Sequence, residues 1–137
     1  MNIRSVILCD FAQVRNQLLT VVSGGVTRVA SAVFPATFSL CVAVVLEVPA
    51  DELAPTPREL RVSINDPTDA QKLAEATVGF IADQLPVMEP GEPHVAQFAF
   101  DFRQLLIARP GQIDVKISAG GQTTDLVSVW FVQVGEP

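Results

Sequence analysis

The sequence predicts an all-β protein, an antiparallel β-sandwich of about seven to eight strands that is immunoglobulin-like or related to the jelly roll. Apolar and polar residues alternate with the period of a strand in several segments. Turn-forming residues separate these segments at near-regular spacing, and no secure amphipathic helix lies between them. A chain of 137 residues can bury a core without a disulfide or a metal, so we expect a single domain over residues 1–137.

The composition indicates more apolar surface than an average soluble domain has. Apolar residues make up 49% of the chain and charged residues only 18%. A pair of packed sheets would bury part of this surface, and a subunit interface is a second place for the remainder. We therefore expect a homo-oligomer or a protein partner.

The N-terminal part predicts two extended segments. Residues 3–11 are short, β-rich and bounded by polar residues, which indicates a first strand. Residues 18–31, LLTVVSGGVTRVAS, form a second run with Gly24-Gly25 in its middle. Glycine inside a run more often marks a bulge or a bend than a break, so we expect one bent strand. Residues 34–37, FPAT, indicate a turn or a short irregular connection.

The clearest strand is TFSLCVAVVLEV, residues 37–48. Its even positions are large and apolar, and its odd positions are mostly small or apolar, which predicts a central strand covered on both faces. A proline-rich connection follows over residues 49–59. Residues 60–66 alternate cleanly between apolar and polar side chains, and residues 66–69, DPTD, have the composition of a turn.

The segment 70–82 fits two structures. Its first half favours a helix that Thr68 or Asp69 could cap, whereas TVGFI favours a strand. We predict a strand, because a turn directly after residues 60–66 places an antiparallel partner here.

The C-terminal half continues with strands. After a turn at residues 88–95, residues 95–102 alternate, and residues 103–111 indicate an irregular crossover that can include a helical turn. Residues 112–118 alternate again. The turn Ala119-Gly120-Gly121-Gln122 supplies the glycines that positive φ angles require. The return strand, residues 126–134, is apolar on both faces, which indicates cover on both sides or an interface.

Charge and hydropathy disfavour two classes of partner. The net charge is −6, and the nine basic residues are spread singly, without the cluster that follows a phosphate backbone. We therefore expect no nucleic acid and no anionic membrane surface as partner. The apolar run at residues 40–48 is too short to span a bilayer, and SVILC between Arg4 and Asp10 is too short for a secretory signal. These features predict a cytoplasmic protein.

The residues offer little for catalysis, cofactors or metals. His94, the one histidine, lies between Pro93 and Val95 at the start of a strand, where a solvated turn residue is far commoner than a triad base. Ser23-Gly24-Gly25 lacks the lysine and the helix of a phosphate-binding loop. Asp51-Glu52 and the pair Glu89 and Glu92 lie in proline-flanked turns, where solvated charges are expected. We expect no catalytic, cofactor-binding or metal-binding residues and no enzymatic activity.

Cys9 and Cys41 are the two cysteines, and both lie in apolar runs. Buried free thiols are the favoured interpretation, and a disulfide between adjacent strands stays open. Asp10 follows Cys9, but adjacent strand residues point to opposite faces. Its negative charge would also raise the pKa of the thiol and weaken it as a nucleophile.

Two groups of residues are candidates for contact with a ligand or partner. Asp10, Arg15 and Arg28 border the apolar N-terminal segments, where they protect strand ends or frame a rim. Trp130 and Phe131 place large aromatic side chains on both faces of one strand. One of them belongs to the core, and the other is an anchor candidate at an interface.

The sequence also resembles a known family. The stretch ILCDFAQVRNQLLTVVSGGVTRV, the VVLEV strand with its proline-rich link, RVSIND, and the closing PGQIDVKISAGGQTTDLVSVWFVQV are similar to a bacterial family of small β-sandwich proteins with a domain of unknown function. The resemblance covers nearly the whole chain. It implies an immunoglobulin-like sandwich and brings no activity, cofactor or catalytic residue.

These observations favour a non-enzymatic interaction or assembly module that associates with itself. The alternative is a small-molecule-binding sandwich with a pocket between the sheets or at the rim formed by Asp10, Arg15 and Arg28.

Overall fold

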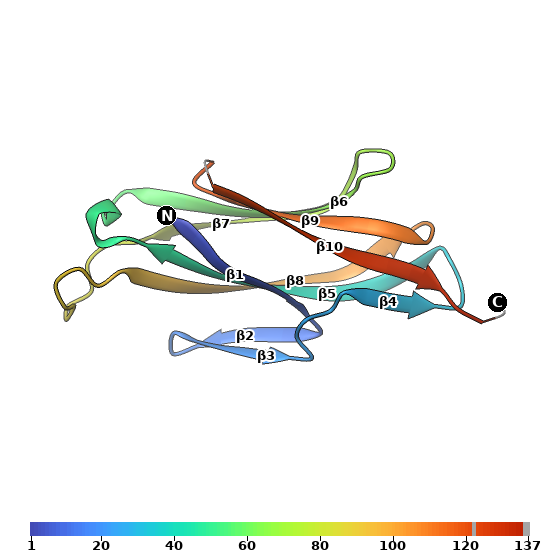
Figure 1. Ribbon diagram of the computed structural model, residues 1–137, viewed down its shortest axis with the longest axis horizontal. Coiled ribbons are helices and arrows are strands. Elements are labelled where there is room, and N and C mark those ends of the chain that lie inside the picture. Colours follow the sequence, from blue (N-terminus) through green and yellow to red (C-terminus); the bar gives the residue numbers. More distant parts are fainter. Residues whose placement is uncertain (122, 136–137) are drawn as a thin grey trace.

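The computed structural model describes residues 1–121 and 123–135. Figure 1 shows two packed sheets with a small hairpin below them. The strands are β1 (Asn2–Cys9), β2 (Phe11–Arg15), β3 (Leu18–Val22), β4 (Arg28–Ser31), β5 (Ala36–Val48), β6 (Pro57–Asp66), β7 (Gln71–Ile81), β8 (His94–Ile107), β9 (Gly111–Ala119) and β10 (Thr123–Gln133). A single 3₁₀ turn, η1 (Ala50–Glu52), interrupts the connection between β5 and β6.

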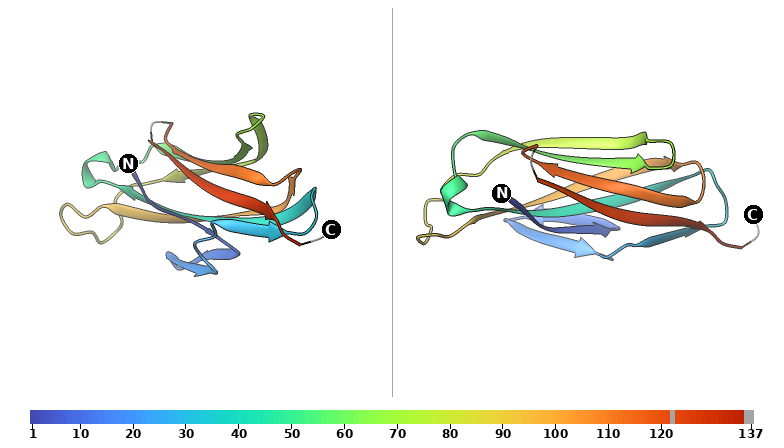
Figure 2. Two further views of the ribbon diagram at one scale, coloured as in Figure 1. Left: turned by 45° about the vertical axis from the view of Figure 1, so that its right-hand side comes forward. Right: turned by 45° about the horizontal axis from the view of Figure 1, so that its top comes forward.

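The strands form three sheets. One layer of the sandwich has the order β1-β5-β8, the other has the order β4-β10-β9-β6-β7, and β2 pairs with β3 alone. All pairings are antiparallel except β4 with β10, which run parallel. The predicted all-β sandwich is therefore confirmed, with ten strands over the described residues rather than seven to eight. Figure 2 shows the two layers from further angles.

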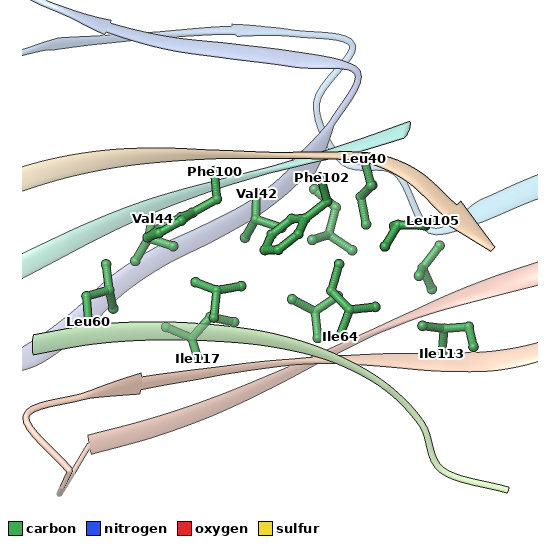
Figure 3. Close-up of a cluster of buried hydrophobic side chains, with 14 of the residues drawn as sticks. Leu40, Val42, Val44, Leu60, Ile64, Phe100, Phe102, Leu105, Ile113 and Ile117 are labelled. Carbon is green, nitrogen blue, oxygen red and sulfur yellow. The ribbon is translucent and has the colours of Figure 1, made fainter. Parts of the chain in front are cut away.

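The core lies between the two sheets. Alternate residues of β5, among them Val42, Val44 and Leu46, point to one side and are fully buried. They meet the inward residues of β6 and β9, such as Leu60 and Ile117, across the interlayer space (Figure 3). Burial of side chains of this size contributes about 1.5–3 kcal/mol each, so the sandwich carries the main share of the folding energy.

Two strand predictions are confirmed. Strand β5 is central, with β1 on one side and β8 on the other, and its second face is covered as well, because Cys41 and Ala43 are buried there. The ambiguous segment 70–82 is strand β7, which pairs antiparallel with β6 as predicted. Asp66 Oδ1 accepts a hydrogen bond from Thr68 N at 2.9 Å in the turn between them.

The predicted strand boundaries in the N-terminal part are wrong in two places. The first strand ends at Cys9, the chain bends at Asp10, and Phe11 opens β2. The segment 18–31 is two strands, β3 and β4, in different sheets. Gly24-Gly25 is therefore a break and not a bulge. A Cβ at Gly24 would lie 2.9 Å from Val21 Cγ1, and Gly25 has φ +85°, so glycine is required where the chain leaves the hairpin.

The predicted crossover at 103–111 is also wrong, because β8 continues to Ile107. Leu40 pairs with Phe102 but Phe38 pairs with Leu105, and Gln104 has φ +59° between them. This bulge inverts the alternation, so that Phe102 and Leu105 both face the core. A second boundary lies earlier than predicted, since β6 starts at Pro57 inside the predicted connection 49–59.

The C-terminal hairpin follows the prediction at its turn. Gly120 and Gly121 have φ +62° and +73°, and Gln122, the last residue of the predicted turn, lies outside the described residues. The return strand β10 begins at Thr123, a little before the predicted 126.

Candidate functional site

The β2–β3 hairpin forms a small sheet of its own and belongs to neither sheet of the sandwich. Its turn consists of Asn16 and Gln17, with φ +52° and +62°. Two consecutive positive φ angles in a two-residue loop define a type I′ turn, which fits the twist of the strands that it joins. Arg15 pairs with Leu18, and the register continues to Phe11 opposite Val22.

The inner face of the hairpin covers the outer face of the β1-β5-β8 sheet. Ala12, Leu19 and Val21 pack there against a small cluster around the buried Cys9, Cys41 and Ala43. This second cluster explains why β5 is apolar on both faces. This second cluster has far fewer buried residues than the core of the sandwich, so the hairpin is held by far less buried surface.

The two cysteines lie opposite each other in the register of β1 and β5 and are free thiols. Burial raises the pKa of Cys9, and the neighbouring Cys41 and Asp10 raise it further. Burial also raises the pKa of Cys41, with Asp101 acting in the same direction. Cys9 Sγ donates to the carbonyl of Cys41 and Cys41 Sγ donates to Asp101 Oδ1, both at 3.6 Å. Protonated thiols in this setting are poor nucleophiles.

The start of β2 lies against the two thiols. The backbone groups of Phe11 and Ala12 act in the opposite direction to burial and lower the pKa of Cys9 and of Cys41, respectively, in part. Strand β2 is thus turned towards β5 and β8. Strand β3 is the outer strand of the hairpin in Figures 1 and 2.

The other face of the hairpin is exposed and carries apolar side chains of both strands, with Gln13 and Arg15 of β2 beside them. Phe11 and Val22 are each 49% exposed and lie opposite each other at one end, and Leu18 is 71% exposed at the other. Side chains at alternate positions share a face, so these three residues lie on one surface with Thr20 between them. We call Phe11, Leu18, Thr20 and Val22 the hairpin surface.

The predicted rim residues are not brought together in one site. Asp10 lies in the bend before β2 and Arg15 ends that strand, so the two residues are up to about 16 Å apart at 3.3 Å per residue. Arg28 lies on β4, beside Trp130 in the register of the parallel pair. Asp10, Arg15 and Arg28 are all exposed, as charged strand ends usually are.

The aromatic pair on β10 divides between core and surface. Phe131 is 2% exposed and packs against Phe38, with ring centroids 4.8 Å apart. Trp130 is 52% exposed on the outer face of the five-stranded sheet, opposite Gln112. Of the two, Trp130 alone can contact a partner.

A polar hollow on the outer face of the five-stranded sheet escaped the sequence analysis. It has a volume of about 440 Å³ and includes Arg61, Lys72 and Lys116. Glu75 neutralises two of these cations, because it pairs with Lys72 and lies 3.6 Å from Arg61. Lys116 makes no ion pair within residues 1–121 and 123–135. Cross-strand register assembles this hollow from β6, β7 and β9, which spacing in the sequence does not show.

Outside this hollow, the candidates for chemistry are the histidine and any group of metal-binding side chains. His94 Nδ1 donates to the carbonyl of Asp83 at 3.0 Å. Among the residues that the structure describes, no three His, Cys, Asp or Glu side chains are grouped to hold a metal ion. The same residues contain no helix long and apolar enough to cross a membrane.

A comparison with protein families places the chain. The model of a family of unknown function, DUF6941, matches residues 4–129. The match covers most of the sequence, so the protein belongs to this family. No curated protein matches it.

Proposed function

We propose that this member of the DUF6941 family is a non-enzymatic assembly module that associates with itself through the β2–β3 hairpin. The observation that carries the proposal is the hairpin itself, which adds an exposed apolar surface and an outer strand to a sandwich that is already closed by its own two sheets. Exposed apolar surface of this kind is typical of interaction sites.

The hydrophobic effect favours contact between the hairpin surface and apolar side chains of a partner. Phe11, Leu18 and Val22 lie together on a two-stranded sheet, and a buried side chain of this type contributes about 1.5–3 kcal/mol relative to an exposed one. A second copy that packed its own apolar side chains beside Leu18 and Val22 would gain part of this energy at two symmetry-related places, because a twofold interface uses the same patch on both subunits.

The charge distribution supports the hairpin as the contact. The chain carries a net charge of −6, so two copies repel each other over most of their surfaces. Residues 11–22, in contrast, contain Arg15 as their only charged side chain. Association through this region therefore meets less repulsion than association through any acidic surface.

Leu18→Lys tests this proposal, with Leu126→Lys as the matched control. Both leucines are exposed strand residues, at 71% and 58%, but Leu126 lies on β10. Native mass spectrometry and light scattering at the highest soluble concentration should show a dimer for the wild type and Leu126→Lys and a monomer for Leu18→Lys. A monomeric wild type, or equal weakening by both variants, would overturn the proposal.

The second candidate function is the binding of a small polar ligand, which the hollow around Lys116 favours. The space between the two sheets is filled by apolar side chains. The candidate ligand site is therefore the hollow on the outer face of the five-stranded sheet and not a pocket between the sheets. Thermal-shift measurements with a panel of polar metabolites test this function. A shift that Lys116→Ala removes and Lys72→Ala weakens supports it, and no shift across the panel rejects it.

A further inference from the structure

We infer that β3 pairs antiparallel with β3 of a second copy, with Thr20 on the twofold axis, so that the two hairpins form one continuous sheet of order β2-β3-β3′-β2′. The inference rests on the proposed self-association and specifies how it occurs. It starts from the position of β3, which has β2 as its single neighbour in the sheets of the described chain.

The turn fixes which backbone groups of β3 are available. In a two-residue hairpin the residues that flank the turn, Arg15 and Leu18, exchange hydrogen bonds, and bonded and non-bonded pairs alternate from there. Thr20 and Val22 therefore bond to β2. The N–H and C=O groups of Leu19 and Val21 point away from β2, to the outer edge.

This alternation of inward-pointing and outward-pointing backbone groups along β3 selects one register for a symmetric pair. The outward-pointing N–H and C=O groups of one copy must meet outward-pointing groups of the other copy. Leu19 and Val21 can therefore pair only with Leu19′ or Val21′. Placing Thr20 opposite Thr20′ pairs Leu19 with Val21′ and Val21 with Leu19′, and each pair exchanges both of its N–H···O bonds. A twofold axis at Leu19 or at Val21 keeps one such pair and leaves the other residue without a strand partner.

The side chains agree with this register. Opposite residues share a face, so Leu18 meets Val22′ and Val22 meets Leu18′ on the hairpin surface. Thr20 and Thr20′ lie between them, and threonine pairs are favourable neighbours across strands. The strand sequence LLTVV carries no charge, so no like charges face each other across the axis.

The edges of the three-stranded sheet carry features that oppose such pairing. Strand β1 shifts register between Ile3 and Ser5, and its Leu8 carbonyl already accepts hydrogen bonds from Gly25 N and Val26 N at 2.9 Å. Strand β8 contains the bulge at Gln104. Bulges, charges and covered carbonyls are the usual means of keeping an edge unpaired.

The edges of the five-stranded sheet are protected in similar ways. Strand β7 shifts register opposite Ile64 and Asn65, next to the charged Lys72 and Glu75. Strand β4 has only four residues and begins with Arg28. Strand β3 has no bulge in its register with β2, no charge and no proline. Compared with β1, β8, β7 and β4, it is therefore the edge best suited to a partner strand.

A second copy fits this edge better than an unrelated strand, because the pattern of outward backbone groups and apolar side chains is self-complementary about Thr20. The same hairpin also supplies the partner at no additional conformational cost, since β3′ is already extended and held by β2′. An unrelated strand would have to be ordered first.

Cysteine cross-linking tests the register directly. Thr20→Cys places two thiols opposite each other on the axis, in a non-hydrogen-bonded pair where Cα atoms are about 4.5 Å apart, a separation that a disulfide can bridge. Mild oxidation should convert this variant to a covalent dimer. Thr77→Cys, exposed on strand β7, is the control and should stay monomeric under denaturing, non-reducing electrophoresis.

Hydrogen exchange of the unmodified protein provides a second test. The amides of Leu19 and Val21 should exchange at least about tenfold more slowly at concentrations that populate the dimer, because each gains a backbone hydrogen bond. The amide of Val14, on the β2 edge, should not change. These measurements need no variant and remain informative if Thr20→Cys does not fold.

The outcomes separate this inference from the proposed function. A dimer without the Thr20→Cys cross-link and without protection at Leu19 and Val21 overturns the register but leaves self-association standing. A monomer at every concentration overturns both. Protection of the same two amides only when a different protein is added would assign the edge to that protein and overturn the pairing of two copies.

Discussion

The sandwich and the β2–β3 hairpin differ in how they cover apolar side chains. In the sandwich, β5, β6 and β9 bury their inward residues completely between two sheets. In the hairpin, Leu19 and Val21 are half-buried against one sheet, and Phe11, Leu18 and Val22 on the other face remain exposed. A sandwich of two sheets is closed by its own chain, whereas the hairpin has one face covered and one face open.

This difference separates stability from association. Changes in the sandwich should alter the free energy of unfolding, and changes on the open face of the hairpin should alter assembly with little effect on folding. The inner face of the hairpin lies between these extremes, because it protects Cys9, Cys41 and Ala43 from water. Three predictions, from the largest expected effect to the smallest, test this division.

The largest effect is expected for Phe131→Ala. Phe131 is fully enclosed and packs against Phe38, so its truncation should lower the free energy of unfolding by about 3–5 kcal/mol. Trp130→Ala, one residue earlier on the same strand, should change it by no more than about 0.5 kcal/mol. Urea unfolding measures both. Equal losses would contradict the assignment of the two rings to opposite faces.

A smaller effect is expected where the chain leaves the hairpin. A methyl group at Gly24 would lie 2.9 Å from Val21 Cγ1 and 3.1 Å from Ile7 Cγ2. Gly24→Ala should therefore loosen the hairpin and cost about 1–3 kcal/mol. Gly79→Ala is the matched control, since its nearest neighbour is the Arg58 carbonyl at 3.8 Å.

Thiol labelling distinguishes local loosening from global unfolding in these variants. Ellman's reagent should modify Cys9 and Cys41 faster in Gly24→Ala than in the wild type under native conditions, because undocking of the hairpin opens the cluster. Labelling at the wild-type rate, together with an unchanged urea midpoint, would show that Val21 and Ile7 accommodate the methyl group.

The sequence is most informative where one strand has a regular pattern. The alternation of β5 predicts its position in the sheet, and its apolar second face indicates a cover. The sequence does not show that the cover is a hairpin, because residues 18–31 are apolar on both sides of Gly24-Gly25. A bulge and a break have the same local composition, and only the pairing of β4 with β10 distinguishes them.

The candidate site could be predicted only in part. The sequence points to the region around the hairpin, but Asp10, Arg15 and Arg28 lie apart in the bend before β2, at the end of β2 and on β4. The edge of β3 could not be found from LLTVV alone, since the same residues suit a buried strand. Its importance depends on β2 being its single neighbour in the sheets that the described residues form, and that is a property of the topology.

The smallest effect concerns the pH dependence of stability. Unfolded thiols ionise near pH 8.5, whereas burial first, and nearby negative charge second, raise the pKa of Cys9 in the folded protein, and burial also raises the pKa of Cys41. The folded state thus keeps protons that the unfolded chain releases. The thiol contribution to the free energy of unfolding should be constant below about pH 8 and fall at higher pH, by at most about 1.4 kcal/mol per pH unit for each thiol.

Urea unfolding from neutral to alkaline pH measures this loss, with the double variant Cys9→Ala, Cys41→Ala as the reference for all other titrating groups. The wild type should lose more stability than the double variant above about pH 9. Parallel curves would mean that water reaches the thiols beneath the hairpin. In that case the inner face of the hairpin would be as open as its outer face, and the hairpin would contribute to assembly but not to the protection of β5.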